Sequence, residues 1–400
     1  MTEFTELKIK SSFKLNHKGR DKYMTFQDEN EYLIHLLYCA IHNTVPEDVP
    51  EHISPQKVFD TGVKHEVANI AYLSITKTEK PIPDDVLKAW KEYYYTAIKR
   101  DAAQKKARYD IINALHSHGI YTLEVQGTVV KKYYPQSHLR MMSDLDIIIP
   151  RDKLAEAEEI MQSIGYQTEY TYNKTELHAA KDILYIELHT EFFSDDANPT
   201  VYNVLNNPFS SATLNEDYTA TVTDTIFYLF HWLHTIKHAT EFMGVGIRRI
   251  IDLYYLENAL KDKADFSYID SILKDNELYE IKANLLAVKE HWFSGSTPKS
   301  DVLVLEKEIF ESGNHGTEEI FYRHKFKDEQ EKGKHFVKFR FFLAFIFPPK
   351  EDIYGAYPFC KEHNYPIALC WIHRWIFSVF NKKKYKSVKR LFKRLKIKMK

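Results

Sequence analysis

Two aspartates, Asp144 and Asp146, stand one residue apart at the start of an apolar run that ends at Ile149. The run is typical of a buried strand, in which alternate side chains share one face at a spacing of about 6.6–6.8 Å. Two buried like charges are costly unless a cation neutralises them. Carboxylate oxygens on a rigid element suit Mg²⁺, which also binds substrate phosphates. The pair therefore indicates a magnesium site for a phosphate-bearing substrate, and the alternative is a strand end whose acids face water.

A glycine turn upstream and a third carboxylate downstream extend this pattern. Gly127 and Thr128 follow a predicted strand and precede a predicted helix start, where free backbone N–H groups can bind phosphate. Glu187 lies in a second short apolar strand over 183–189, where an unpaired buried glutamate would be costly. Three carboxylates on adjacent strands beside a phosphate-binding turn favour two-metal phosphoryl chemistry. The structural alternative for Gly127 is an ordinary turn glycine.

The order of these motifs resembles that of the DNA polymerase beta superfamily of nucleotidyltransferases, and more narrowly that of the uncharacterised bacterial family NTP_transf_5. The family pattern has a glycine, an arginine before an acidic pair, a helix ending in Gly-Tyr, and Glu-Leu-His. The matching residues are Gly127, Arg140, Asp144, Asp146, Gly165, Tyr166 and Glu187 to His189, followed by a helical block with His234, His238, Arg248 and Asp252. The matched core spans about residues 105–260.

The resemblance implies both a fold and an activity. The fold is α/β (α+β), with a small mixed-sheet polymerase-beta-like nucleotidyltransferase core in a mostly helical chain. The activity is the transfer of a nucleoside monophosphate from an NTP such as ATP to an unknown hydroxyl-bearing acceptor, with release of pyrophosphate. Asp144, Asp146 and Glu187 are expected to be the catalytic residues and the ligands of a two-metal Mg²⁺ site. Glu187 would also act as general base toward the acceptor hydroxyl.

The resemblance further implies a set of nucleotide-binding residues: Gly127, Thr128, Arg140, His189, His234, His238 and Arg248. Several of them have structural alternatives. Arg140 could pair with the aspartates or with Glu187, and Arg248 could form a helical ion pair with Asp252. His189 could be a structural histidine. His231 shares a helix face with His234 and His238, but without a cysteine or an H-E-x-x-H motif a polar stripe facing a cleft is favoured over zinc.

The chain departs from the family pattern at two residues. Gln126 stands where the family usually has lysine, which removes a charge that could hold phosphate. Thr128 stands where the superfamily usually has glycine or serine, and it keeps a hydroxyl that can bind a phosphate oxygen. These differences affect the expected substrate affinity more than the expected metal binding.

Composition places the chain among cytoplasmic proteins. Its 400 residues are 44% hydrophobic and carry a net charge of −1, which by itself implies no particular partner. The three cysteines lack metal-ligand spacing and fit a reducing compartment. The first fifteen residues lack an apolar signal core, and the longest apolar run, 341–347, is too short to span a bilayer.

Four regions are expected along the chain. They are an N-terminal helical region over 1–104, the α/β core over 105–200, a helical domain over 201–300, and a C-terminal helical segment over 301–400. Residues 198–224 are predicted to be irregular, because they contain Asn-Asn-Pro and Ser-Ser. Residues 312–334 are predicted to form an extended link. Helices are predicted at about 85–119, 153–164, 225–242, 248–261, 268–276 and 279–290.

The C-terminal tail is basic and amphipathic. Residues 381–400 contain eleven lysines and arginines and no acid, so the other 380 residues carry a net charge of −12, from 44 basic and 56 acidic residues. Val388, Leu391, Phe392, Leu395 and Met399 fall on one helical stripe. Such a helix could contact an anionic membrane through residues 382–400, bind nucleic acid, or stay solvated. Membrane contact is favoured over nucleic acid, because the rest of the chain is not basic.

Two other functions are compatible with these residues. The chain could be a non-catalytic nucleotidyltransferase-fold protein that is docked to a membrane or partner by its basic C-terminal helix. It could also be a transferase directed at RNA, although its near-neutral charge argues against this function.

Overall fold

The computed structural model of the chain divides into two compact units, Met1–Phe321 and Tyr322–Lys400. In the first unit it describes residues 27–172, 175–193, 207–240 and 244–314, with single residues at 205 and 316. In the second it describes 365–380 and isolated residues between 343 and 363. The four-part division expected from the sequence stays a prediction.

The described strands form one mixed sheet of seven strands in the order β3-β4-β5-β2-β1-β7-β6. Their bounds are β1 Thr122–Glu124, β2 Asp144–Ile148, β3 Gln167–Tyr172, β4 Glu176–Lys181, β5 Leu184–His189, β6 Ala212–Leu214 and β7 Thr219–Val222. The β2–β5 and β1–β7 pairs are parallel, and the other pairs are antiparallel. The expected mixed-sheet α/β fold is therefore confirmed.

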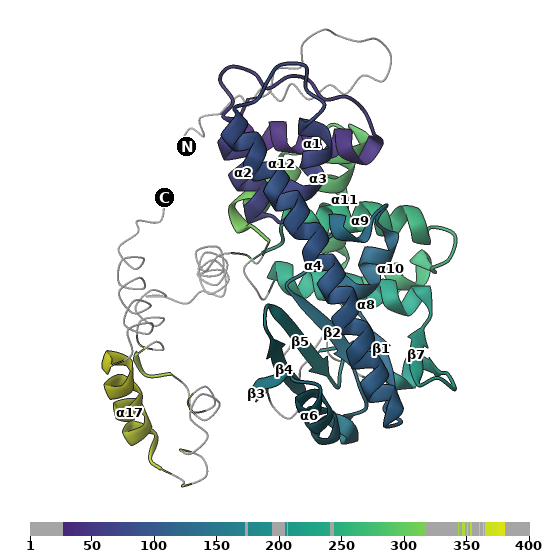
Figure 1. Ribbon diagram of the computed structural model, residues 1–400, viewed down its shortest axis with the longest axis vertical. Coiled ribbons are helices and arrows are strands. Elements are labelled where there is room, and N and C mark those ends of the chain that lie inside the picture. Colours follow the sequence, from purple (N-terminus) through teal and green to yellow (C-terminus); the bar gives the residue numbers. More distant parts are fainter. Residues whose placement is uncertain are drawn as a thin grey trace, which may run out of the picture. The chain divides into compact units, whose positions relative to one another are not determined.

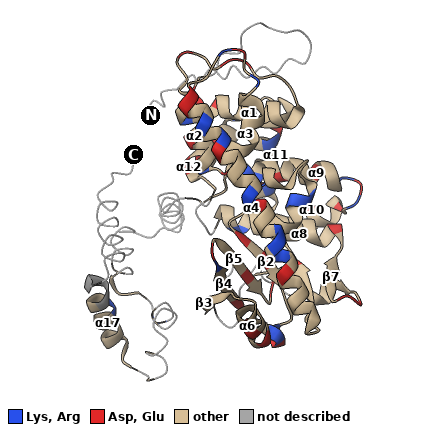
Figure 2. Cartoon of the chain, in the orientation of Figure 1, with Lys and Arg blue, Asp and Glu red and all other residues tan. Residues whose placement is uncertain are grey.

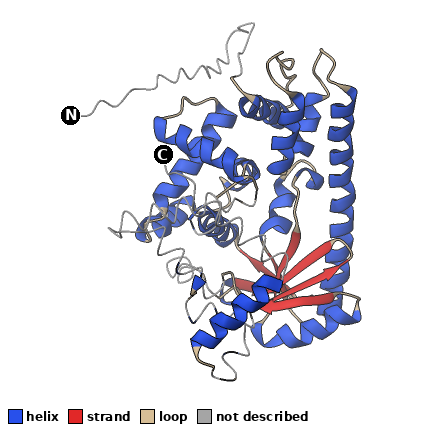
Figure 3. Cartoon of the chain, turned by 90° about the vertical axis from the view of Figure 1, so that its left-hand side faces the viewer, coloured by secondary structure: helices blue, strands red, loops and turns tan. Residues whose placement is uncertain are grey.

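The prediction that residues 198–224 are irregular is wrong at β6 and β7. Each of these strands has only three or four residues, so neither presents the alternation that marks a longer strand in a sequence. They pair with each other, and β7 adds to the edge of β1, which extends the sheet beyond the expected core. Figure 3 shows the strands gathered in one sheet beside a larger group of helices.

One face of the sheet is buried beneath two helices, α4 (Asp84–Ser117) and α6 (Leu154–Ser163). Leu145 and Ile147 of β2 and Ile186 and Leu188 of β5 pack there in one apolar cluster. Because alternate residues of a strand point to opposite faces, Asp144, Asp146, Glu187 and His189 lie on the other face. The apolar pattern of the strands thus decides which way the carboxylates point.

The remaining helices of the first unit share a larger apolar core. They include α1 (Glu29–His42), α2 (Pro55–Lys64), α3 (Ala68–Ile75), α8 (Asp224–Thr240), α9 (Ile247–Leu260), α10 (Phe266–Asp275), α11 (Tyr279–Ser294) and α12 (Ser300–Ser312). The predicted helices over 225–290 agree with α8 to α11 within a few residues. The long α4 contacts α2 and α3 as well as β1, β5 and α6, so it joins this core to the sheet (Figure 1).

Both signs of charge are interspersed along α4 (Figure 2). Four of its cations pair with nearby acids at an i, i+4 spacing or across to neighbouring elements: Lys88, Lys105, Lys106 and Arg108. This long helix therefore does not present a uniformly basic face of the kind that nucleic-acid binding requires.

The second unit contains α17 (Ile367–Phe380). Cys360 and Cys370 are buried there with Ile353, and Trp371 Nε1 donates a hydrogen bond of 2.9 Å to the Pro348 carbonyl. The amphipathic stripe predicted between Val388 and Met399 lies outside the described residues, as does most of the predicted link over 312–334. Within the described part of the chain, every helix is too short or too polar to cross a bilayer.

Candidate active site

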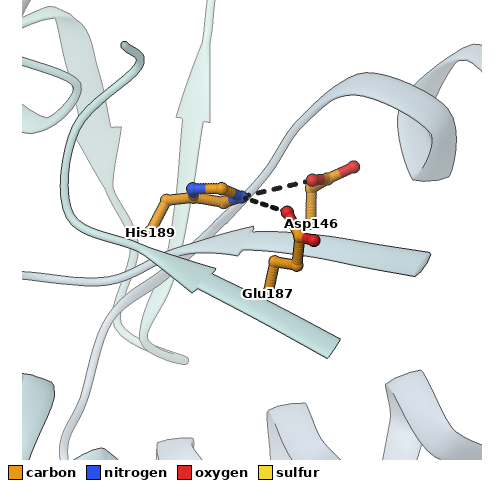
Figure 4. Close-up of side chains that lie close together, drawn as sticks. All are labelled: Asp146, Glu187 and His189. Carbon is orange, nitrogen blue, oxygen red and sulfur yellow. Dashed lines mark hydrogen bonds and ion pairs between the residues drawn. The ribbon is translucent and has the colours of Figure 1, made fainter. Parts of the chain in front are cut away.

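The strand register brings the predicted carboxylates together. In the parallel pairing of β2 with β5, Asp146 is opposite Glu187 and Asp144 is opposite Tyr185. His189 follows Glu187 by two residues and shares its face of the sheet. Figure 4 shows the side chains of Asp146, Glu187 and His189 directed toward one another from the two strands.

Imidazoles and carboxylates alternate across three strands at this face. His189 Nε2 lies 3.2 Å from Asp146 Oδ1 and 3.5 Å from Glu187 Oε2. The other ring nitrogen, Nδ1, lies 3.5 Å from Glu176 Oε1 on β4. His178, also on β4, places Nδ1 3.2 Å from Glu187 Oε1 and Nε2 3.5 Å from Glu176 Oε2. The antiparallel register of β4 with β5 produces this pattern, because Glu176 is opposite His189 and His178 is opposite Glu187.

The carboxylates respond differently to this setting. Burial raises the pKa of Asp144 to about 6, and the nearby charges of Asp146 and Glu187 add to the rise. Burial by itself would also raise the pKa of Glu187, but hydrogen bonds from His178 and His189 lower it to about 2. Glu187 therefore stays ionised, whereas the ionised form of Asp144 is destabilised by burial and by the negative charges nearby. A cation near Asp144 would relieve that cost.

The donor atoms of this site fit a divalent metal ion. Asp146, Glu187 and His189 each offer one ligand atom, and these atoms lie within 4.8 Å of one another. Among the described residues, no other group of three or more histidines, cysteines and acids is gathered in this way. His231, His234 and His238 of α8 do not form such a group, so the described geometry does not support a zinc site there.

The glycine turn lies against the same pocket. Gly127 is in the five-residue helix α5 (Gln126–Val130), directly after β1. A Cβ at Gly127 would stand 2.7 Å from Arg140 Nη1 and 2.8 Å from Met142 Sδ, so a side chain there would displace both neighbours. Thr128 is buried, its hydroxyl lacks a hydrogen-bond partner among the described residues, and it does not line the pocket.

Arg140 forms a buried ion pair. Its Nε and Nη2 donate hydrogen bonds of 2.8 Å to the two carboxylate oxygens of Asp252 on α9. Tyr134 Oη donates a further bond of 2.7 Å to Asp252 Oδ1. The alternatives in which Arg140 pairs with Asp144, Asp146 or Glu187 are therefore wrong, because the fold brings α9 against the segment before β2.

Arg248 is also paired, and not with Asp252. Its guanidinium forms an ion pair with Glu66 after α2 and donates a hydrogen bond to the Met141 carbonyl. The alternative of a helical pair between Arg248 and Asp252 is wrong, because each has a closer partner outside α9. Arg248 Nε is buried and has no hydrogen-bond partner in the described part of the chain.

One pocket collects most of the predicted residues. It is lined by Gln126, Gly127, Arg140, Met142, Ser143, Asp144, Asp146, Glu187, His234, His238, Arg248, Arg249 and Asn314. The rings of His234 and His238 lie 4.6 Å apart, and burial lowers the pKa of His234 well below its ordinary value, so its imidazole is neutral. His189 contacts the pocket residues Asp146 and Glu187 but is not itself among the lining residues. Thr128 and His231 do not line the pocket either.

Arg249 is a charged residue of this pocket that the sequence did not single out. Within the described part of the chain its guanidinium makes no hydrogen bond or ion pair, in contrast to those of Arg140 and Arg248. Burial lowers its pKa to about 10, so the guanidinium stays charged at neutral pH. The pocket therefore contains one arginine whose charge is not balanced by a paired carboxylate.

Asn314 reaches the pocket through a close backbone approach at Gly246. A Cβ at Gly246, the residue before α9, would stand 2.7 Å from the Asn314 Cα and from the Gly313 carbonyl oxygen. Gly246 thus allows the start of α9 to pack tightly against residues 313–314. The Gly-x-Gly sequence over 244–246 precedes a helix without following a strand. Asn314 Nδ2 donates a hydrogen bond of 3.0 Å to Glu66, which also holds Arg248.

Two missed residues could have been found from the sequence. Glu176-Leu177-His178 repeats the triplet Glu187-Leu188-His189 at a distance of eleven residues. The turn between the triplets makes the strands antiparallel, so each glutamate meets the histidine of the other triplet. Tyr170 of β3 stacks on His178 at 4.1 Å and holds its ring in place.

Comparisons with known proteins place the chain in a family. No curated protein sequence matches the chain. Two solved structures of ANT(2'')-Ia are similar at 11% identity, namely a solution structure of this antibiotic-resistance factor and a crystal structure in complex with adenylyl-2''-tobramycin. They cover 48% and 45% of this chain and 97% and 99% of their own, with TM-scores of 0.33 and 0.32, which are too low to carry an argument. The sequence model of the family NTP_transf_5, described as an uncharacterised nucleotidyltransferase, matches residues 51–294. This match covers more than half of the chain, and the chain is therefore a nucleotidyltransferase of that family.

Proposed function

We propose that this enzyme transfers a nucleoside monophosphate from an NTP to an acceptor hydroxyl, with Mg²⁺ as the expected metal and pyrophosphate as the second product. The single observation that supports this proposal most strongly is the register of β2 and β5, which sets Glu187 opposite Asp146 and beside Asp144. Asp144, Asp146 and Glu187 would hold the metal. When bound, the metal would neutralise the negative charge of the phosphates.

The residues of the chain would then orient the reactants. The acceptor oxygen would attack the α-phosphorus, the bond from that phosphorus to the β-phosphate bridging oxygen would break, and pyrophosphate would leave. Glu187, whose carboxylate also pairs with His178, would orient the acceptor hydroxyl and take its proton. Such catalysis depends chiefly on positioning and on preorganised charge.

The arginines that line the pocket support a phosphate-binding role. Arg249 has no paired carboxylate among the described residues, so its guanidinium is available to the triphosphate. Arg248 also lines the pocket, with its guanidinium held by Glu66 and the Met141 carbonyl. Gly127 lets the chain approach closely, and the neutral His234, together with His238, would hydrogen-bond the nucleotide or the acceptor.

Calorimetric titration tests the proposal directly. ATP, CTP, GTP and UTP are titrated into the wild type with and without Mg²⁺, and into Asp146→Asn and the control Asp152→Asn, which changes an exposed acid after β2. We expect metal-dependent binding of at least one NTP that is lost in Asp146→Asn and kept in Asp152→Asn. Binding that does not respond to Asp146→Asn, or the absence of NTP binding in every condition, would contradict the proposal.

We also propose a peripheral contact with anionic membrane through residues 382–400. Leu369, Ile372 and Ile376 on α17 are each more than half exposed and recur at i, i+3 and i+7, directly before the basic tail. The full chain should sediment with vesicles that contain phosphatidylserine, whereas a chain that ends at residue 380 should stay in the supernatant. Equal sedimentation of both chains, or with neutral vesicles, would refute this contact.

A further inference from the structure

His189 has the environment of a metal-ligating histidine. One ring nitrogen, Nε2, faces Asp146 and Glu187, and these three ligand atoms lie within 4.8 Å of one another (Figure 4). The other ring nitrogen, Nδ1, faces the carboxylate of Glu176 at 3.5 Å. Histidines that bind metals almost always donate their second N–H to a carboxylate, a carbonyl or water, which fixes the tautomer and the ring orientation.

We propose that His189 Nε2 is a ligand of the metal that Asp146 and Glu187 bind, with Glu176 as the residue that orients it. The site would therefore prefer a first-row transition ion of the Zn²⁺ or Co²⁺ class over Mg²⁺. This inference rests on the proposed function only in that it requires a metal in this pocket. It differs from the expectation from the sequence, in which three carboxylates hold Mg²⁺.

The spacing of the donor atoms supports this assignment. Ligands at about 2.0–2.2 Å from a tetrahedral ion are roughly 3.3–3.6 Å apart, whereas adjacent ligands of an octahedral Mg²⁺ are roughly 2.8–3.0 Å apart. His189 Nε2 is 3.2 Å from Asp146 Oδ1 and 3.5 Å from Glu187 Oε2. These separations are also those of ion pairs, so they place the three donors within reach of one ion and leave the choice of ion to the donor types.

The chemistry of the donors favours a transition ion over Mg²⁺. Imidazole suits Zn²⁺ and similar ions, whereas Mg²⁺ selects oxygen ligands. Three carboxylates surround His189, and the negative charge that they supply attracts a divalent ion to the place between Asp146 and Glu187. Binding would displace a proton from Nε2, as metal ligation by histidine requires.

Leu188 and the strand pairing keep this geometry rigid. Leu188 is fully buried on the opposite face of β5, so the strand cannot rotate without exposing it. His189 and Glu176 are direct partners in the β4–β5 ladder. The imidazole is therefore held in place by the sheet itself, which is the rigidity that a metal site needs.

Two measurements on the full chain test the assignment, and neither depends on activity. Pulsed electron paramagnetic resonance of bound Mn²⁺ detects a directly coordinated ¹⁴N nucleus, and calorimetry compares the affinities for Zn²⁺, Co²⁺ and Mg²⁺. We expect nitrogen coupling in the wild type and in the control His118→Gln, which changes an exposed histidine at the end of α4, and its loss in His189→Gln. Glu176→Gln should weaken Co²⁺ binding about 10–100-fold.

The wild-type Mn²⁺ spectrum shows whether a nitrogen atom is coordinated, even if a variant does not fold. If Mn²⁺ binds without nitrogen coupling and Asp146→Asn abolishes binding, the metal is held by carboxylates alone. The inference about His189 is then overturned while the proposed function stands. If no divalent ion binds with or without ATP, both the inference and the metal-dependent function fail. Mg²⁺ affinity equal to that for Co²⁺ would also overturn the stated preference.

Discussion

The buried ion pair between Arg140 and Asp252 is expected to contribute strongly to the stability of the enzyme. Asp252 is fully buried, Arg140 is 4% exposed, and two hydrogen bonds of 2.8 Å join them. Removal of one partner from such a pair typically costs about 3–5 kcal/mol, because the other charge stays buried without a counter-charge. Asp252→Asn should therefore lower the free energy of unfolding by about 3–5 kcal/mol.

The pair also predicts how this loss depends on pH. Burial by itself would raise the pKa of Asp252, but the charge and hydrogen bonds of Arg140 lower it to about 2. An aspartate in the unfolded chain titrates near about 3.9. The stabilising contribution is thus complete above that pH and is lost as the pH falls toward about 2, and the shift corresponds to about 2–3 kcal/mol. The stability difference between the wild type and Asp252→Asn should shrink by this amount in acid.

Urea unfolding followed by circular dichroism, at neutral pH and at several acid pH values, measures both effects. Asp110→Asn is the matched control, because it removes the exposed partner of Lys106 in an i, i+4 pair and should cost less than about 0.5 kcal/mol. Arg140→Met combined with Asp252→Leu removes both charges and should recover most of the loss. A loss below about 1 kcal/mol for Asp252→Asn, or one that does not shrink in acid, would refute this reasoning.

Three further changes probe the pocket. Gly127→Ala places a Cβ against Arg140 and Met142 and should destabilise the fold by about 1–3 kcal/mol, measured by thermal unfolding. Arg249→Ala should weaken NTP binding about 10–150-fold, the equivalent of a charged hydrogen bond, with partial recovery in Arg249→Lys by calorimetry; unchanged affinity would exclude a phosphate contact. His178→Gln should lower kcat about 10–100-fold with little change in the KM for NTP, because it loosens Glu187. An equal change in both constants would indicate a general loss of structure instead.

The carboxylate face could be predicted from the sequence because its determinants are local. The alternation of acids with Leu145, Ile147 and Leu188 fixes which side chains share a face, and a strand carries that information within a few residues. β2 and β5 are not successive along the chain, because β3 and β4 lie between them, so their pairing does not follow from chain order. The register, which sets Asp146 opposite Glu187, also had to come from the structure.

The partners of the arginines could not be predicted in this way. Arg140 is 112 residues from Asp252, and Arg248 is 182 residues from Glu66. Local spacing offered nearer candidates for both residues, and it gave the wrong partners. The unpaired state of Arg249 is equally non-local, because it depends on which neighbours the other two arginines have already engaged.

These long-range pairs also explain how the two walls of the pocket stay in register. Arg140 precedes β2 by a few residues, and Asp252 lies one turn after the start of α9, so their bond ties the carboxylate strand to the helix that carries Arg248 and Arg249. Glu66 adds a second tie through Arg248. Arg248 and Arg249 therefore cannot move away from the carboxylates of β2 without breaking a buried charge pair. A loss of this tie in Asp252→Asn should weaken NTP binding as well as folding, although Asp252 itself is not part of the pocket lining.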